Sequence, residues 1–262
     1  MDPAHNAAAR FAALSALFDA ASQRHLADRG VAPGWHCLEV GGGGGSIARW
    51  LGHRVGPTGR VLATDVETRF LEQIQLPNVD VRCHDITRDA LPERAFDLIH
   101  TRMVLMHLPS RDQVLPRLMS ALKPGGWLVC EEFDRLSAPP DPDASPGEVV
   151  LKTHEAMARA HRDQGGALQY GRVLFGRFRG MGLRHLGAEA RLVMVQAGSW
   201  GASLLRASYE QRRHAMIGAG YVTDQEFDAD VARLNEPGFM MPSSLMWTVW
   251  GRRSGEGPCA DS

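Results

Sequence analysis

An apolar segment that runs directly into a row of glycines constrains this chain more than any other feature. Residues 38–46 read Leu-Glu-Val-Gly-Gly-Gly-Gly-Gly-Ser, and the helix-like stretch Ile-Ala-Arg-Trp-Leu follows at once. Because glycine has no side chain, the backbone here can adopt positive φ angles and lie directly against a ligand. The succession of strand, glycine turn and helix predicts a loop that binds a nucleotide-type cofactor.

Acidic residues stand at the ends of three neighbouring strand-like segments. Glu39 lies just before the glycines, Asp65 ends the run 61–65, and Asp85 follows the run 79–84. The carboxyl ends of parallel strands line one edge of a sheet, and ligands bind in the crevice there. A carboxylate can accept hydrogen bonds from both hydroxyls of a ribose, and another can accept from an exocyclic amine. The three acids are therefore expected to converge on one site.

Together these residues resemble the class I S-adenosylmethionine (SAM) dependent methyltransferases, in particular those that act on small molecules. The first motif of that family reads acid-x-Gly-x-Gly-x-Gly, which corresponds here to Glu39, Gly41, Gly43 and Gly45. The resemblance covers about residues 35–135 and is much weaker elsewhere. It implies that the cofactor is SAM.

The resemblance also implies roles for individual side chains around that cofactor. By position, Asp65 would bridge the ribose hydroxyls and Asp85 would meet the adenine amine. Their apolar neighbours Val66 and Ile86 would lie against the faces of the adenine. Arg102, just after the fourth strand-like run, stands where the family approaches the methionine moiety, and a guanidinium can bind its carboxylate through two hydrogen bonds.

A nicotinamide or flavin dinucleotide is the alternative cofactor. Five glycines fit several registers, so residues 43–48 also satisfy the Gly-x-Gly-x-x-Ala fingerprint, with an acid about 20 residues further on. The glycines alone do not separate the two cofactors. Glu39, Asp85 and the Lys-Pro-Gly-Gly turn at 123–126, which is common in the methyltransferase family, favour SAM.

Composition limits the class of protein. With 262 residues, 44% of them hydrophobic, and a net charge of −1, the chain can build one α/β domain with a sizeable core. The near-neutral charge provides no basic face for nucleic acid. No segment approaches the ~20 apolar residues that cross a bilayer, and the first residues lack the features of a signal peptide. We expect a cytoplasmic enzyme whose partner is a small-molecule substrate, with neither nucleic acid nor membrane, and the sequence leaves a homodimer open.

Alternating strand-like and helix-like runs predict a Rossmann-like α/β fold with a seven-stranded, mostly parallel sheet and helices on both faces. Strands are expected at 37–40, 61–64, 79–83, 96–100, 127–131, 186–195 and 244–251. Helices are expected between them at 47–55, 69–75 and 111–122, the last with a start signal at Ser110-x-x-Gln113 and an internal proline. In the family that the sequence resembles, the last two strands lie side by side and the seventh is antiparallel.

Residues 1–262 are expected to form a single SAM-binding methyltransferase domain with additions. An amphipathic helix within 1–30 is predicted to cover the cofactor cleft. Segments 138–183 and 196–243 are longer than the fold requires and predict helical lid insertions over the substrate side. Helices are expected there from 145 to about 164 and at 172–181, 203–217 and 224–234, with capping boxes at Ser145-x-x-Glu148 and Thr223-x-x-Glu226.

Catalytic residues are harder to assign. Methyl transfer from a sulfonium is an in-line displacement that depends mainly on alignment and desolvation, so a base is not always required. His107 is a weak candidate for a base, and a structural role is the stronger reading. Glu131 or Glu132, at the end of the fifth strand, could face the acceptor, although a structural carboxylate is again favoured.

The sequence does not indicate a metal site. The acids Asp134, Asp141 and Asp143 lack a convincing ligand spacing, and no metal is expected. The four cysteines also lack metal-type spacing and are expected to be reduced core residues: Cys37, Cys83, Cys130 and Cys259.

The function predicted is SAM-dependent methyl transfer to a small acceptor, and the apolar side chains of the lid favour an apolar or aromatic one. Two alternatives remain open. In one, the protein binds SAM and uses its positive charge in a reaction that transfers no methyl group. In the other, it is a non-catalytic SAM-binding partner of another protein. The residues do not show which atom, oxygen, nitrogen or carbon, would receive the methyl group.

Overall fold

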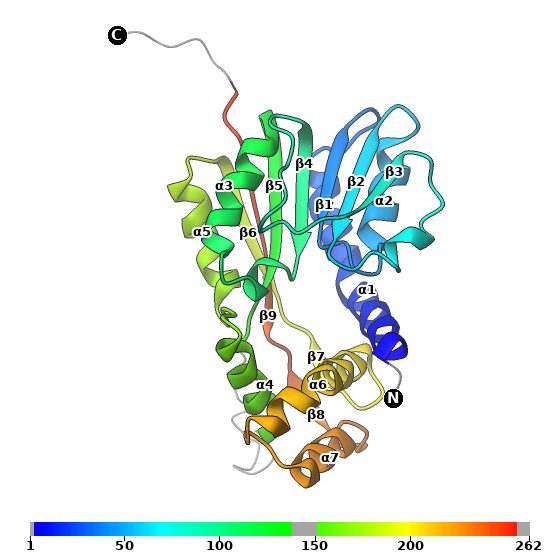
Figure 1. Ribbon diagram of the computed structural model, residues 1–262, viewed down its shortest axis with the longest axis vertical. Helices are drawn as coiled ribbons and strands as arrows, with labels where there is room; N and C mark the ends of the chain where they lie inside the picture. The colour runs from blue at the N-terminus through cyan, green and yellow to red at the C-terminus, as the bar shows by residue number, and fades with distance from the viewer. Residues whose placement is uncertain (1–2, 138–150, 256–262) are drawn as a thin grey trace.

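The computed structural model describes residues 3–137 and 151–255, and a twisted seven-stranded sheet lies at its centre (Figure 1). The central strands are mainly apolar and buried, whereas the edge strands carry exposed polar residues. The strands of this sheet are β1 (His36–Val40), β2 (Arg60–Asp65), β3 (Val79–Cys83), β4 (Phe96–Arg102), β5 (Leu122–Asp134), β6 (Arg184–Arg191) and β9 (Leu245–Arg252).

The order of the strands places a crevice at one edge of the sheet. They lie in the order β3-β2-β1-β4-β5-β9-β6. Neighbours among β1 to β5 pair in parallel, whereas β9 is antiparallel to both β5 and β6. The direction of winding reverses between β1 and β4, and ligands of such sheets bind beside the carboxyl ends at this switch point. The predicted Rossmann-like, mostly parallel seven-stranded fold is confirmed.

Helices cover both faces of the sheet because side chains alternate between the faces along each buried strand. Cys37 packs with residues of α2 (Ser46–Val55), and its neighbour Leu38 packs on the other face with residues of α3 (Arg111–Ala121) and α5 (Tyr170–Gly180). The two cores are therefore separated by the sheet. Both faces are dry, as a parallel sheet requires.

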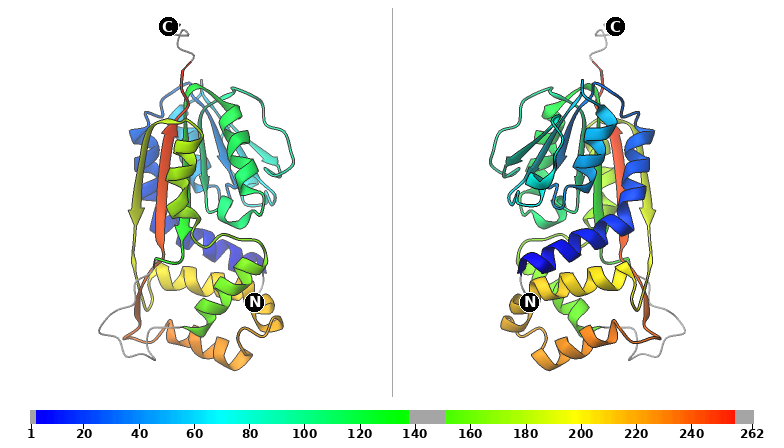
Figure 2. Two further views of the ribbon diagram at one scale, coloured as in Figure 1. Left: turned by 90° about the vertical axis from the view of Figure 1, so that its left-hand side faces the viewer. Right: turned by 90° about the vertical axis from the view of Figure 1, so that its right-hand side faces the viewer.

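Beyond the carboxyl ends of the parallel strands lies a second group of elements with its own core, which we call the cap (Figure 2). The cap consists of α4 (Lys152–Asp163), α6 (Trp200–Gly218), α7 (Asp224–Arg233) and the two-stranded antiparallel sheet of β7 (Met194–Gln196) and β8 (Met240–Pro242). Tyr209, Phe227 and Leu234 are fully buried in its core. The Thr223–Glu226 capping box predicted for α7 is present.

The long helix α1 (Pro3–Asp28) connects the cap to the sheet (Figure 2). It packs against α6 of the cap, and Asn6 Nδ2 donates a hydrogen bond to the carbonyl of Ala207 (3.2 Å). Further along α1, Leu14 and Phe18 join the main core under the sheet. This position brings one side of α1 to the edge where the parallel strands end.

Several local predictions need correction. The helix expected at 69–75 is a single 3₁₀ turn, η1 (Leu71–Gln73), which ends because Ile74 adopts an extended backbone conformation. The strand expected at 186–195 is divided between β6 and β7, which belong to different sheets. Ser110 makes no side-chain cap at α3.

The predictions for one capping box and for the four cysteines have mixed outcomes. The Ser145-x-x-Glu148 box lies outside the described residues, and α4 begins at Lys152. Cys83 is exposed rather than in the core, whereas Cys37 and Cys130 are buried and free, and Cys259 lies outside the described residues. Cys83 sits at the end of edge strand β3, which has a neighbour on one side only.

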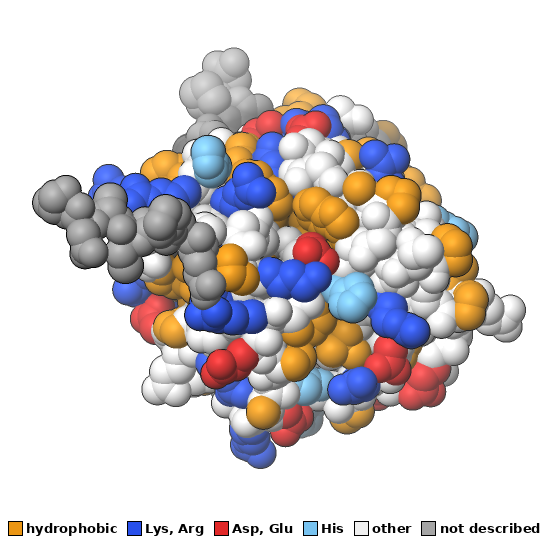
Figure 3. All heavy atoms as spheres, turned by 90° about the horizontal axis from the view of Figure 1, so that it is seen from above, with side chains coloured by type: hydrophobic (Ala, Val, Ile, Leu, Met, Phe, Trp, Pro, Cys, Tyr) orange, Lys and Arg blue, Asp and Glu red, His pale blue; other side chains and the backbone are white. Residues whose placement is uncertain are grey.

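The surface at the end of the molecule where β9 finishes carries charges of both signs. Lys and Arg side chains alternate there with Asp and Glu (Figure 3). This face therefore has no continuous basic patch. Within residues 3–137 and 151–255, no helix has the length and apolar character needed to span a membrane.

Candidate active site

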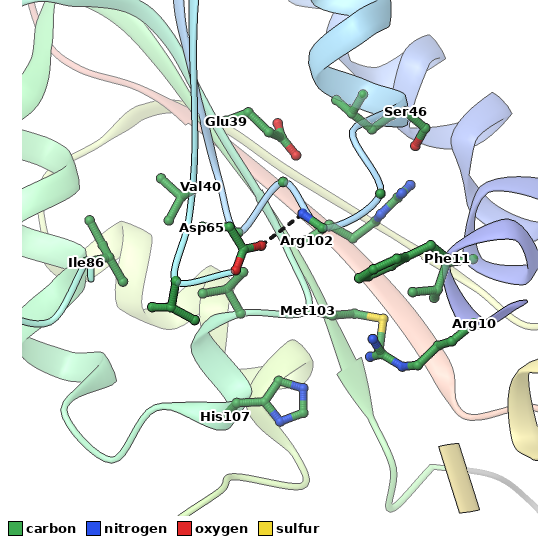
Figure 4. Close-up of a pocket in the computed structure, with 18 of the residues that line it drawn as sticks. Arg10, Phe11, Glu39, Val40, Ser46, Asp65, Ile86, Arg102, Met103 and His107 are labelled. Carbon is green, nitrogen blue, oxygen red and sulfur yellow. Dashed lines mark hydrogen bonds between the residues drawn. The ribbon is translucent and has the colours of Figure 1, made fainter. Parts of the chain in front are cut away.

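A cavity of about 410 Å³ opens at the carboxyl ends of the parallel strands, and we call it the main cavity (Figure 4). The glycine loop after β1 and the ends of β2 and β4 form one side. Helices α1 and α6 contribute to the other side. All the cofactor-binding candidates of the sequence line this one cavity: Glu39, Gly41, Gly43, Asp65, Val66, Asp85, Ile86 and Arg102. His107 lines it as well.

The glycine loop cannot carry side chains where it meets its neighbours. Gly41 has a φ of +68°, and a Cβ built there would lie 2.2 Å from Cγ2 of Val104. At Gly43, with a φ of +50°, a Cβ would lie 2.8 Å from the ring of Phe11. Gly45 (φ +77°) lies at the N-terminus of α2 and does not line the cavity. The bare loop thus lets α1 and the turn after β4 approach, and leaves backbone facing the cavity.

Local hydrogen bonds orient the two strand-end aspartates. Asp65 accepts from the backbone N–H of Gly43 through Oδ2 (2.9 Å) and from that of Glu67 through Oδ1 (3.2 Å) (Figure 4). Asp85 accepts through Oδ1 from the hydroxyl and the backbone N–H of Thr87 (2.6 and 2.9 Å), and these bonds lower the pKa of Asp85. Asp85 is therefore an ionised acceptor at neutral pH.

Apolar surface accompanies these carboxylates. Val66, directly after Asp65, leaves 68% of its surface exposed in the wall of the main cavity, whereas Ile86 is buried in the same wall. Across the cavity, the Phe11 ring of α1 packs edge-on against Phe70, with ring centroids 5.2 Å apart. A flat heterocycle between these walls would find apolar contacts with Val66 and Ile86 on one side and with Phe11 on the other.

Below the glycine loop, a buried histidine joins two carboxylates. His100 of β4 contacts Glu39 through Nδ1 (2.6 Å) and lies 3.5 Å from Glu131 through Nε2. Burial alone would lower the pKa of His100, but the two carboxylates outweigh it and raise the pKa to about 9. Burial would likewise raise the pKa of Glu131, yet His100, Arg102 and Ser22 lower it to about 2. At neutral pH, a positive imidazolium is therefore held between the acids of β1 and β5.

The same network extends to α1. Ser22 donates to Glu131, and Thr248 of β9 donates to the other carboxylate oxygen (2.9 Å). Arg102 donates to Ser22 (3.0 Å) and forms an ion pair with Asp19 (2.9 Å). Because Asp19 also accepts from the hydroxyl of Ser46 (3.1 Å), the network reaches the first turn of α2. It fixes α1 against the glycine loop.

Glu132 has a different structural task. Its carboxylate accepts hydrogen bonds from three successive backbone N–H groups at the start of the 3₁₀ turn η2 (Leu105–His107): those of Val104, Leu105 and Met106 (3.1, 2.7 and 3.2 Å). Burial raises the pKa of Glu132 to about 8, against the opposite effect of these donors. Neither Glu131 nor Glu132 lines the main cavity, and the hydrogen bonds of both carboxylates go to neighbouring elements of the fold.

His107, at the end of this turn, has a low affinity for protons. Its ring packs on that of His161, with centroids 4.8 Å apart. Burial lowers the pKa of His107 to about 2, and the charges of His161, Arg135, Arg212 and Arg10 act in the same direction. His107 is neutral at physiological pH and is a weak base in this environment.

A second, smaller cavity of about 50 Å³ adjoins the main cavity, and we call it the apolar chamber. Met103 lines both and therefore marks their junction. Met103 has a φ of +57°, a left-handed conformation that is uncommon outside glycine and that gathers at functional sites. The chamber is lined mainly by apolar residues of α1, β5 and the cap: Leu17, Phe18, Phe133, Met157, Val193, Val195, Leu204, Leu205 and Met241.

The comparison with protein-family models agrees with this geometry. Residues 38–130 match the model described as a methyltransferase domain. This segment contains the glycine loop, the strand-end acids and β5. The match supports the resemblance of this chain to the class I SAM-dependent methyltransferases.

Curated proteins are similar to this chain over about half of each sequence. The ubiquinone/menaquinone biosynthesis C-methyltransferase UbiE of Laribacter hongkongensis is 34% identical over 126 residues, which are 45% of this chain and 50% of the relative. Methyltransferase str2 of Strobilurus tenacellus is 33% identical over 138 residues, covering 52% and 49% respectively. The chain thus spans about half the length of the curated relatives it matches.

Solved structures show the same fold at low identity. A chain from the complex between the Haloferax volcanii Trm112 methyltransferase activator and a methyltransferase has a TM-score of 0.57 and 16% identity, covering 96% of this chain and 97% of that one. Phosphoethanolamine N-methyltransferase 2 of Haemonchus contortus, in complex with S-adenosylhomocysteine, has a TM-score of 0.54 and 15% identity, covering 86% and 50%. At this identity the likeness concerns the fold alone.

Sequence reasoning missed the part of the site contributed by helices. Arg10 and Phe11 of α1 and Gln211 and Arg212 of α6 line the main cavity. The amphipathic pattern within 1–30 predicts a helix at the cleft but does not indicate which of its side chains reach it. Nothing local to α6 indicates that Arg212 approaches the glycine loop, because only packing between α1 and α6 brings it there. Among the described residues, no group of three His, Cys, Asp or Glu side chains could hold a metal ion.

The His100→Gln variant tests the buried network. Removing one partner of a buried ion pair typically costs about 3–5 kcal/mol, so we expect the free energy of unfolding at pH 7 to fall by roughly 3 kcal/mol. The pKa of His100 is higher in the folded protein than its ordinary 6.5, so its contribution is complete below pH 6.5 and disappears as the pH rises through about 9. Urea unfolding at pH 6, 7.5 and 9.5 measures both effects.

The exposed His53→Gln substitution is the matched control and should leave the free energy of unfolding unchanged within error. Wild-type protein should lose stability between pH 7.5 and 9.5, and this loss should shrink in His100→Gln. An equal alkaline loss in wild type and His100→Gln would show that His100 is not the protonated group.

Proposed function

We propose that the protein transfers a methyl group from SAM to a small acceptor with an apolar or aromatic body. One observation carries this proposal: a cavity that contains a bare glycine loop and two strand-end carboxylates opens, at Met103, beside an apolar chamber. The main cavity suits an adenosyl cofactor, and the apolar chamber suits an apolar acceptor. The similarity to C-methyltransferases of quinone biosynthesis supports a small-molecule acceptor.

In this proposal SAM occupies the main cavity. Asp65 would accept from the ribose hydroxyls and Asp85 from the adenine amine, while Val66 and Ile86 contact the adenine. The glycine backbone would lie along the methionine part of the cofactor. The match of residues 38–130 to a methyltransferase domain supports SAM as the cofactor.

Arg102 suits the carboxylate end of the cofactor, although it already has partners. Its guanidinium has five N–H donors, and the described contacts with Ser22 and Asp19 use two nitrogen atoms on one side of the group. Both partners belong to α1 and hold the guanidinium at the wall of the main cavity. We propose that the remaining donors bind the methionine carboxylate.

The sulfonium supplies an activated methyl group, so the protein's contribution is mainly to align and desolvate the reacting atoms. The strand-end acids and the glycine loop would fix the cofactor. Met103, at the junction of the two cavities, would lie next to the path of the methyl group. Because the low pKa of His107 makes it a weak base, we propose that His107 shapes the site and does not remove a proton.

We further propose that the helical parts of 138–183 and 196–243 act as a lid over the acceptor, and that residues 1–30 cover the cofactor. Within these segments, α4 and α6 carry residues of the apolar chamber, and α1 carries residues of both cavities. In contrast, α5 packs against β5 and β9 and belongs to the body of the sheet. The lid would therefore consist of the cap.

Incubation with SAM labelled in its methyl group separates this function from the two alternatives. Methyl transfer gives labelled product and S-adenosylhomocysteine in equal amounts. A SAM-binding enzyme that transfers no methyl group would give unlabelled product without S-adenosylhomocysteine. A non-catalytic partner protein would bind SAM and turn over none of the acceptors tested.

Asp65→Ala should weaken cofactor binding. Loss of a hydrogen bond to a charged group typically costs about 1.5–3 kcal/mol, which corresponds to a roughly 10- to 150-fold higher Kd for S-adenosylhomocysteine in calorimetry. Asp80→Ala, an exposed substitution on β3, should leave the Kd unchanged. Equal affinities of wild type and Asp65→Ala would contradict the assignment of Asp65 to the ribose.

His107→Gln should reduce kcat less than about 10-fold, because loss of a general base typically costs 10²- to 10⁴-fold. Glutamine retains a polar group of similar size in the turn. The measurement is the steady-state rate with a turned-over acceptor, together with the Kd for S-adenosylhomocysteine to show that the cofactor site is intact. A loss of 10²-fold or more with normal cofactor binding would identify His107 as a base.

A further inference from the structure

Three arginines converge near the junction of the main cavity and the apolar chamber. They come from three distant parts of the chain: Arg10 from α1, Arg135 from the end of β5, and Arg212 from α6. Arg10 and Arg212 line the main cavity, and Arg135 lines the chamber. The charges of Arg212 and Arg10 both lower the pKa of Arg135, so the three guanidinium groups lie within electrostatic range of one another.

No carboxylate among the described residues compensates for these charges. Burial and the charges of Arg212 and Arg10 together lower the pKa of Arg135 to about 10, and only Tyr209 acts in the opposite direction. Burial and Arg212 likewise lower the pKa of Arg10. Arg212 donates to a neutral acceptor, the side chain of Gln164 (2.9 Å). The Nε atom of Arg135 is buried and has no hydrogen-bond partner among these residues.

Arginines elsewhere in this protein have different surroundings. Arg172 of α5 forms an ion pair with Asp134, the last residue of β5 (2.5 Å). Arg213, the neighbour of Arg212, pairs with both Asp224 and Asp228. A buried cation without a partner is unfavourable, because it loses hydration and gains nothing in exchange. Such a group persists in a protein where its partner is a ligand.

The histidines around the cluster do not offset its charge. Burial lowers the pKa of His107, His154 and His161 to about 2, 4 and 4, and Arg135 contributes to the shift of each. All three are therefore neutral at physiological pH. They add polarity to the junction without competing with an anion for the arginines. His154 contacts the hydroxyl of the buried Tyr209 (3.1 Å) and so stays in place beside the chamber.

From this geometry we infer that the methyl acceptor carries an anionic group, a carboxylate or a phosphate, which Arg135 binds while Arg10 and Arg212 add positive charge. The inference rests on the proposed function, because it names the class of substrate for the same site. A guanidinium can donate two parallel hydrogen bonds to either anion. The apolar body of the acceptor would occupy the chamber beside Phe133, whose ring lies under the Arg135 guanidinium (5.6 Å).

Binding of three probes to wild-type protein and to Arg135→Met tests this inference. The probes are 4-hydroxybenzoate, phenyl phosphate and the neutral 4-hydroxybenzamide, titrated calorimetrically with and without saturating S-adenosylhomocysteine. We expect at least one anion to bind wild type 10-fold or more tightly than the amide. Arg135→Met should lose most of this preference. The better of the two anions identifies the group as carboxylate or phosphate.

Thermal unfolding distinguishes binding from a structural role of Arg135. Methionine keeps the apolar stem that packs on Phe133 and removes a partly buried charge that has no carboxylate partner among the described residues. The unliganded variant should therefore unfold at the same temperature as wild type or higher. The preferred anion should raise the midpoint of wild type and leave that of Arg135→Met unchanged. Arg135→Lys, which keeps the charge without the planar fork, should show an intermediate affinity and serves if Arg135→Met does not fold.

Arg179→Met, an exposed substitution on α5, is the control and should behave as wild type. The inference is wrong if neither anion is preferred over the amide, or if Arg135→Met and Arg135→Lys retain the wild-type preference. A higher Kd of Arg135→Met for S-adenosylhomocysteine, with unchanged anion binding, would assign the arginine to the cofactor and also overturn it. Failure of wild type to bind S-adenosylhomocysteine would contradict the proposed function, not this inference. The titrations of the three probes in the absence of S-adenosylhomocysteine would still show whether Arg135 binds an anion.

Discussion

The site depends on one buried positive charge. His100 lies between Glu39 and Glu131 and takes up a proton because both carboxylates are buried beside it. These three residues belong to β4, β1 and β5, the central strands of the sheet. Without the imidazolium, two acids would face each other in a dry interior, which is strongly unfavourable. The histidine therefore joins the acid of the glycine motif to β5 beneath the main cavity.

Hydrogen bonds connect Glu131 and Glu132 of β5 to three elements around the main cavity: α1, the start of α2 and the turn after β4. Glu131 accepts from Ser22 of α1, and Arg102 joins Ser22 to Asp19, which in turn accepts from Ser46 at the start of α2. Glu132, the next residue of β5, holds the turn that carries Met103 and His107. Two adjacent glutamates thus point to opposite faces of one strand, as the period of a strand requires. One fixes α1 and the other fixes the turn after β4.

The sequence identified residues that come together in the main cavity, because its signals are local. Glycines, strand-end acids and their apolar neighbours act through residues that are close in sequence, and the parallel sheet brings them together. All eight predicted residues line the main cavity for this reason. The apolar chamber and its junction with the main cavity depend on contacts between α1, β5 and α6. No local sequence pattern indicates which side chains meet there. Arg10, Arg135 and Arg212 illustrate this limit, since each resembles a solvent-exposed arginine when taken alone.

The secondary-structure predictions were wrong where tertiary packing overrides the local sequence pattern. The segment 69–75 has helical residues but forms one turn, since Ile74 is extended and its side chain is buried in one cluster with Leu71. The run 186–195 has strand character throughout, yet it leaves the main sheet after Arg191 and pairs with β8 in the cap. Similarly, the two glutamates of β5 look available at the sheet edge, and only the network with His100 and the turn η2 shows that both are occupied.

The central claim is that the main cavity binds SAM by its sugar and base. A crystal structure of the protein with S-adenosylhomocysteine tests it most directly. The account predicts both ribose hydroxyls within hydrogen-bond distance of Asp65 and the adenine amine within reach of Asp85, with the sulfur facing Met103. A ligand that binds away from the glycine loop, or a main cavity that takes up a nicotinamide dinucleotide in place of S-adenosylhomocysteine, would contradict it.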